Sequence, residues 1–278
     1  MSAATHTARR SLPRICGLPV ALFSVSLGLH GQTSSAIEVS DHRPLADALE
    51  KLQSVTGIAI NYEDVPYEHP ADLEDVSTAE QRVRYPGYRL LVPRKGQVKA
   101  TVGPHAQGSV IETLASVYAL LASYRAAGLP GDFKVDQRNG MVYVAPTKVL
   151  NRAGFLQDAQ PRMETAVSIP YAERRVIDCL ETITRALSAA TGTIIAAGTF
   201  PFSSAETRVT CGANGEAARD LLATLLSKVS DRPASYNLLF DPMTGYMLNL
   251  RFIAQSGPPA AVPESAPQNT PSPFFVSR

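Results

Sequence analysis

The chain has 278 residues, of which 45% are hydrophobic and 18% charged, and its formal net charge at pH 7 is +1. This composition is typical of a folded globular protein and excludes a largely disordered chain. Three of the 26 basic residues and none of the 25 acidic ones precede Ile37, so the chain from Ile37 onward is weakly acidic. That balance gives no reason to expect nucleic-acid binding, which requires a basic surface.

Residues 1–36 have the pattern of an export signal. Arg9, Arg10 and Arg14 form a basic region without an acidic residue, and a mostly apolar stretch of about 15 residues follows. Small and polar residues then lead to Ala36, where we expect cleavage. A membrane span needs about 20 apolar residues. We therefore predict a periplasmic or secreted protein, whose membrane contact is limited to this segment if it stays uncleaved.

A first structural unit is predicted over residues 37–149. It opens with a short alternating strand, and Pro44 then fits the first turn of a helix. Leucines at spacings of three and four give this helix one apolar face, and Gly57 fits its C-terminal cap. A strand follows over residues 58–62.

Residues 63–95 interrupt this unit with an irregular stretch that contains four prolines, which we interpret as an insertion. Tyrosine and arginine gather in and around it, and both residue types are favoured at interaction hot spots. We predict a partner-binding surface made by seven residues: Tyr62, Tyr67, Arg82, Arg84, Tyr85, Tyr88 and Arg89.

The first unit resumes with a strand over residues 98–102. Ser109 and Glu112 form a capping box that opens a second helix. We expect this helix to bury Ile111, Leu114, Val117, Tyr118 and Leu121. A hairpin is predicted across Asn139-Gly140, because this dipeptide is the strongest short hairpin signal.

Residues 163–253 repeat the order of the first unit, after a linker predicted over residues 150–162. A helix ends before Gly192, a strand follows, Asn214 is expected to cap a second helix, and a hairpin closes the unit. Residues 254–278 are rich in Pro, Ser and Ala, which predicts a disordered tail. The fold class is therefore predicted as α+β, with two tandem small β-α-β units. Each is expected to have a short mixed sheet with two helices on one face.

Two cysteines, Cys179 and Cys211, remain after the predicted signal segment. A lone pair in an exported protein is a disulfide candidate. The bridge would close a loop of about 30 residues and add roughly 3 kcal/mol to stability. The alternative is two buried free thiols that pack as small apolar residues.

The segment from Arg43 to Tyr62, with its Pro-Leu-x-x-Ala-Leu helix followed by Thr-Gly and a strand, resembles the short N-terminal domain shared by secretins and TonB-dependent receptors. The resemblance covers residues 37–146 apart from the insertion, and extends to residues 163–253. It implies small β-α-β units that pack against neighbours or receive a partner in the periplasm. The family supplies no catalytic residues, and neither a secretin ring domain nor a β-barrel region is recognisable here.

No catalytic, metal or cofactor motif is recognisable in the sequence, and the histidines lack the helical spacing of a metal pair. We therefore expect a non-catalytic exported module of the cell envelope that binds an envelope protein or another copy of itself. One alternative is an extracytoplasmic enzyme with an interdomain site that uses His69 or His105. Another is a small-ligand-binding protein, for which a sizeable apolar pocket between the domains is the discriminating feature.

Overall fold

The computed structural model describes residues 34–103, 106–201, 205–229 and 232–253, which belong to one compact unit. The fold is α+β. The predicted signal up to residue 33 and the predicted disordered tail lie outside the described residues. The helices and 3-10 turns are α1 (Pro44–Thr56), η1 (Pro70–Asp72), α2 (Ala79–Arg84), α3 (Val110–Ala126), η2 (Arg162–Glu164), α4 (Val176–Thr191) and α5 (Ala218–Val229).

The strands of the N-terminal half are β1 (Ser35–Asp41), β2 (Ile60–Glu63), β3 (Leu73–Asp75), β4 (Leu91–Pro93), β5 (Gly96–Val102), β6 (Asp132–Arg138) and β7 (Met141–Leu150). The strand β8 (Leu156–Asp158) follows in the connection. The strands of the C-terminal half are β9 (Ala166–Arg175), β10 (Ile195–Ala197), β11 (Arg208–Ala217), β12 (Ala234–Asp241) and β13 (Gly245–Phe252).

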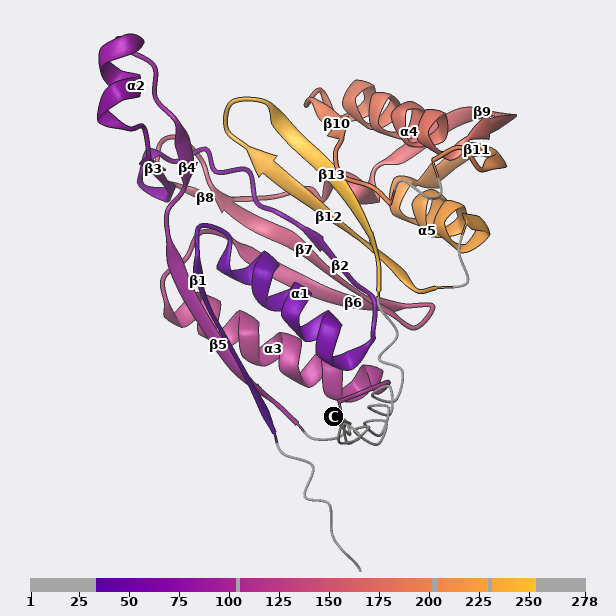
Figure 1. The fold of residues 1–278 in the computed structure, drawn as a ribbon, viewed down its shortest axis with the longest axis horizontal. Coiled ribbons are helices and arrows are strands. Elements are labelled where there is room, and N and C mark those ends of the chain that lie inside the picture. The colour runs from indigo at the N-terminus through magenta and orange to yellow at the C-terminus, as the bar shows by residue number, and fades with distance from the viewer. Residues whose placement is uncertain (1–33, 104–105, 202–204, 230–231, 254–278) are drawn as a thin grey trace, which may run out of the picture. The chain divides into compact units, whose positions relative to one another are not determined.

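One seven-stranded sheet runs through both halves in the order β10-β13-β12-β2-β7-β6, with β8 paired to β7 (Figure 1). The halves meet where β2 and β12 pair in parallel, with Tyr62 opposite Asn237 and Glu63 opposite Leu238. The expectation of a separate short sheet in each half is therefore corrected. The connection over residues 150–162 is also more than a tether, because β8 lies within it and pairs antiparallel with the end of β7.

The helices of the N-terminal half lie between two sheets. Helices α1 and α3 contact β2 and β7 of the large sheet on one side, and the antiparallel ribbon β1–β5 on the other (Figure 1). The C-terminal half follows the same order of elements, and its ribbon β9–β11 contacts α4 and α5. The expected helices on one face of a sheet are thus covered on their outer side by a second, smaller sheet.

Local sequence signals account for several boundaries. Gly57 ends α1 with φ +70°, and its N–H donates to the Gln53 carbonyl at 2.8 Å. Gly192 ends α4 in the same left-handed conformation, which glycine adopts without steric cost. The predicted hairpin joins β6 to β7, with Asn139 and Gly140 both at positive φ. Such a turn matches the twist of the flanking strands.

The buried face of α3 differs from the expected one. Ile111 and Tyr118 are 79% and 57% exposed, and Leu114 is only half-buried. The helix instead buries Val117, Leu120, Leu121 and Tyr124, together with two small polar residues. Apolar residues occur nearly all round this helix, so their spacing does not define a single face.

The start of α5 also differs from the expectation. Asn214 does not cap this helix, because β11 continues to Ala217 and α5 begins directly after it at Ala218. The pairing of β11 with β9 continues to Ala217 through two bulges, one after Cys211 and one after Asn214.

Candidate functional sites

The insertion forms an arm, residues 73–93, made of β3, α2 and β4 and projecting from the sheet (Figure 1). Strands β3 and β4 pair antiparallel at its base. The arm closes further out, where the Val76 N–H donates to the Leu90 carbonyl at 2.9 Å. The Leu90 N–H in turn donates to the Ser77 hydroxyl at 2.7 Å. These bonds give the arm an ordered stem.

The tip of the arm is a short helix whose side chains face solvent. Thr78 and Gln81 form a reciprocal capping box at the start of α2, and the helix buries no residue. Val83 is 82% exposed, Tyr85 54% and Tyr88 44%. The arm tip therefore displays large apolar and aromatic side chains that make little contact with the rest of the chain.

Five of the seven residues predicted to bind a partner lie on this arm, and all five are exposed: Arg82, Arg84, Tyr85, Tyr88 and Arg89. Arg82 forms an ion pair with Asp75 at 3.5 Å. The guanidinium of Arg84 lies 5.5 Å from the centroid of the Tyr85 ring. Residues 79–89 contain three arginines and one acidic residue, Glu80, so the arm tip is basic as well as aromatic.

The other two predicted contact residues belong to the core, so the prediction is wrong for them. Tyr62 is 2% exposed and Tyr67 is 5% exposed. Both hydroxyls donate to Oδ1 of Asp64, at 2.8 Å from Tyr62 and 2.7 Å from Tyr67. Because Asp64 is fully buried, its hydrogen bonds hold both rings inside the protein.

Asp64 connects the two halves through a buried network. The Arg43 Nε donates to Asp64 Oδ2 at 3.2 Å, and Arg43 Nη2 donates to the Phe240 carbonyl of β12 at 2.6 Å. The Phe240 N–H donates to Asp64 Oδ2 at 3.4 Å. Burial raises the pKa of Asp64, whereas the Arg43 charge and the tyrosine hydroxyls oppose that rise. These contacts indicate a structural role for Asp64, since its carboxylate accepts hydrogen bonds from both halves of the protein.

The neighbouring residue, Glu63, anchors the connection between the halves. Its carboxylate accepts the N–H of Arg162 at 2.5 Å and that of Met163 at 3.1 Å. Burial raises the pKa of Glu63 to about 7, although both hydrogen bonds act in the opposite direction. Glu63 is therefore a buried acid that titrates near neutral pH.

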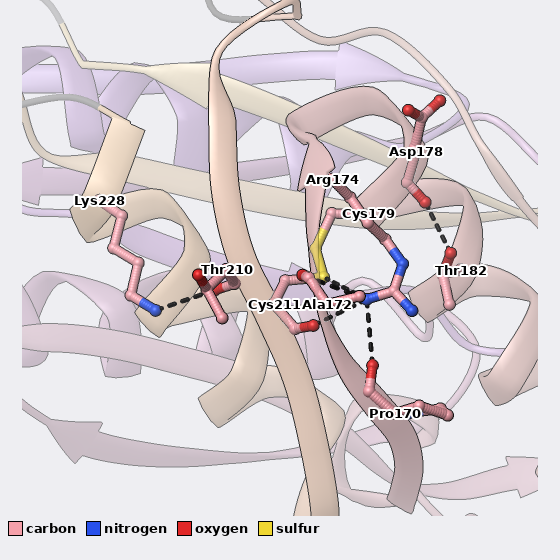
Figure 2. Close-up of a disulfide and its surroundings, with 9 residues drawn as sticks. All are labelled: Pro170, Ala172, Arg174, Asp178, Cys179, Thr182, Thr210, Cys211 and Lys228. Atoms are coloured by element: carbon pink, nitrogen blue, oxygen red, sulfur yellow. Dashed lines mark hydrogen bonds between the residues drawn. A yellow bond between two sulfur atoms is a disulfide. The ribbon is translucent and has the colours of Figure 1, made fainter.

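The two cysteines of the C-terminal half are bonded, as the sequence suggests (Figure 2). Cys179 on α4 and Cys211 on β11 have Cα atoms 6.4 Å apart and are separated by 32 residues. Both side chains lie in the core, and Arg174 Nη1 donates to the Cys211 carbonyl at 2.8 Å. A disulfide between an outer ribbon and its helix points to an oxidising compartment.

A pocket that no sequence motif indicates lies between α5 and the large sheet. Its volume is about 480 Å³, within the range of small-molecule sites. Its walls come from the segment that follows α1, from β2, from β7 with the β6–β7 turn, from α5 and from the start of β12. Apolar side chains such as Ile58, Met141 and Leu226 alternate with a few polar ones, notably Asn61 and Arg219. These residues are far apart in sequence, so no local motif indicates the site.

Among the described histidines, His42 has its Nδ1 2.9 Å from the Pro93 carbonyl and 3.1 Å from a carboxylate oxygen of Glu74. The His69 Nδ1 accepts the Ala71 N–H at 3.3 Å at the start of η1, which is a capping role. His105 lies outside the described residues. No cluster of three or more metal-ligating side chains occurs among the described residues. None of the helices in that part of the chain combines the length and the apolar character needed to cross a membrane.

No protein-family model, curated protein or solved structure matches the chain.

Proposed function

We propose that the protein is a non-catalytic interaction module of the cell envelope and that its arm contacts a partner protein. The carrying observation is the arm tip, which exposes Val83, Tyr85 and Tyr88 beside three arginines on an ordered stem. Tyrosine and arginine supply large contact areas and directed hydrogen bonds at interfaces. The arm is therefore suited to a partner with an acidic, partly apolar surface.

The envelope location is proposed from two observations. One is the basic and then apolar pattern of residues 1–36. The other is the disulfide between Cys179 and Cys211, which forms most readily outside the cytoplasm. The resemblance of the segment from Arg43 to Tyr62 to the short N-terminal domain of secretins and TonB-dependent receptors supports the same role. In this proposal the chain is a stand-alone relative of that domain.

The proposal is tested by site-specific photo-crosslinking in intact cells, with a crosslinking amino acid at Tyr85 or Tyr88. A matched control places it at Tyr118 on α3, which is exposed to a similar degree as Tyr85. We expect one adduct of defined mass from both arm positions and none of that mass from Tyr118. Charge reversal of Arg82, Arg84 and Arg89 to Glu should abolish it.

Mass spectrometry of the adduct identifies the partner. An envelope protein supports the proposal directly, and a second copy of the chain supports its assembly form. The same adducts from Tyr118 as from the arm, or an adduct that survives charge reversal, would contradict it.

A further inference from the structure

The pocket between α5 and the large sheet contains hydrogen-bond donors that lack strong acceptors within the protein. The first is the side-chain amide of Asn61, which is 3% exposed. Its Oδ1 accepts the Tyr236 N–H at 2.9 Å. That bond fixes the orientation of the amide, so Nδ2 is its free end. The only acceptor near Nδ2 in the described structure is the Met141 sulfur at 3.9 Å, and a thioether accepts weakly.

The second donor is the hydroxyl of Tyr143, whose side chain is 4% exposed. Its hydrogen-bond partner in the described structure is the same Met141 sulfur, again at 3.9 Å. Two neutral donors therefore share one weak acceptor at the wall of a single pocket. A buried donor without a good acceptor costs free energy, and an oxygen atom of a bound molecule would remove that cost.

The third donor is the guanidinium of Arg219 on α5, which is 7% exposed. Its Nη1 is paired with Glu164 at 2.8 Å, and its plane lies over the Tyr143 ring, 5.7 Å from the centroid. Its Nε makes no hydrogen bond within the described residues, and the Asp220 carboxylate is 3.7 Å away. Arg219 is therefore held in place by ion pairs with Glu164, with Asp220 and, at 3.9 Å, with Asp136, and its Nε is buried without a hydrogen bond.

The rest of the pocket wall is largely apolar. Ile58, Ala223, Leu226 and Pro233 line it together with the ring of Tyr236. The charged side chains among its described lining residues are both arginines, Arg219 and Arg232. Apolar walls with a few convergent donors favour a molecule with an apolar body and acceptor oxygens at one end.

We propose that this pocket binds a small organic carboxylate with a flat apolar body. The carboxylate would accept hydrogen bonds from Asn61 Nδ2 and the Tyr143 hydroxyl and would lie near the charge of Arg219, while the body packs against the apolar wall. The carboxylates of Glu164, Asp136 and Asp220 already compensate much of the Arg219 charge, so the preference for an anion over a neutral carbonyl should be moderate. This inference is independent of the arm and of the partner proposed for it.

Isothermal titration of the purified protein with 2-naphthoate, and with its neutral isostere 2-naphthamide, tests the proposal. We expect saturable 1:1 binding of naphthoate, with the amide about tenfold weaker, because charge-assisted hydrogen bonds are the stronger ones. Benzoate and decanoate serve as smaller and longer carboxylates. If none of the three carboxylates binds at millimolar concentration, the proposal is overturned.

Variants of pocket residues test whether the two ligands bind in this pocket. Arg219→Met should reduce naphthoate affinity to that of the amide without changing the affinity for the amide. Tyr143→Phe removes one donor but retains the ring beneath Arg219, and should weaken both ligands. The matched control is Tyr171→Phe, which changes a side chain that is 64% exposed on β9 and should leave both affinities unchanged.

Ala223→Leu keeps a helix-forming residue on α5 and fills the pocket, so it should abolish binding of both ligands. This variant also keeps the proposal testable if Arg219→Met does not fold. Binding that survives Ala223→Leu, or equal affinity for naphthoate and naphthamide in the wild type, would show that the carboxylate site does not exist.

Discussion

The guanidinium of Arg43 lies 3.2 Å from Oδ2 of the fully buried Asp64, and the same side chain reaches the Phe240 carbonyl in the other half of the protein. Asp64 thus accepts hydrogen bonds from Arg43 just before α1, from the core residues Tyr62 and Tyr67, and from the Phe240 N–H of β12. Removing one partner of a buried ion pair leaves a charge without compensation, which typically costs several kcal/mol.

Replacing Arg43 with Met should lower the free energy of unfolding by about 2–3 kcal/mol at pH 7. This loss of stability is small for a buried ion pair because Arg43 is one-quarter exposed and Asp64 keeps three other hydrogen-bond donors. A double-mutant cycle of Arg43→Met with Asp64→Asn, measured by urea unfolding, should give a coupling energy above about 1 kcal/mol.

The matched control for this cycle is Arg125 with Asp132, an ion pair at 2.7 Å whose side chains are 56% and 41% exposed. Solvent screens such a pair, so its coupling energy should stay below about 1 kcal/mol despite the shorter distance. Equal coupling in the two pairs would mean that burial does not strengthen the pair of Arg43 with Asp64.

Glu63 should make stability depend on pH. Its pKa is about 7 in the folded protein and 4.5 as an ordinary side chain, so the folded state binds the proton more tightly. The stabilisation from the neutral form is complete below pH 4.5 and is lost as pH rises through 7. The difference between the two pKa values corresponds to about 3 kcal/mol in the free energy of unfolding.

The variant Glu63→Gln isolates this effect, because the amide resembles the neutral acid. We expect it to match the wild type near pH 4.5 and to exceed the wild type in unfolding free energy by up to about 3 kcal/mol at pH 8. Urea unfolding across this range checks the difference. A variant that is less stable than the wild type at pH 8 would show that the two hydrogen bonds to Glu63 outweigh its burial.

Local signals in the sequence predict much of the fold, and the errors come from long-range contacts. The capping glycines, the Asn139-Gly140 turn and the α+β class follow from neighbouring residues. The burial of Tyr62 does not, because it depends on Asp64 and on a strand more than 170 residues away. The same parallel pairing of β2 with β12 joins the halves into one sheet.

Of the two candidate sites, the arm can be predicted from neighbouring residues and the pocket cannot. The arm follows from composition, since its prolines, tyrosines and arginines are close together in the chain. The pocket does not, because Asn61, Tyr143 and Arg219 meet only when the sheet and α5 are assembled. In the sequence alone, each of these three residues is indistinguishable from an ordinary strand or helix residue.

The disulfide should contribute substantially to stability. Replacing Cys179 and Cys211 together with Ala should lower the free energy of unfolding by about 3 kcal/mol, because the bridge restricts the unfolded chain over a loop of 32 residues. Dithiothreitol under partly unfolding conditions should lower the melting temperature of the wild type and leave the double variant unchanged. A wild type insensitive to complete reduction would show that the bridge stabilises nothing.

Removing the arm tip should separate its function from the stability of the fold. Helix α2 buries no residue, and the Val76–Leu90 hydrogen bond brings the two strands of the stem together. Replacing residues 78–89 with Asn-Gly would keep the buried Ser77 and its bond to the Leu90 N–H and close the arm with a short turn. We expect the free energy of unfolding to change by less than about 1 kcal/mol, because surface elements contribute little.

Naphthoate affinity should also be unchanged in this variant, whereas capture of the envelope partner should be lost. Co-purification of the partner identified by crosslinking measures that loss. Retained capture by this variant would place the interaction surface elsewhere on the protein, and a large loss of stability would mean that the arm supports the core.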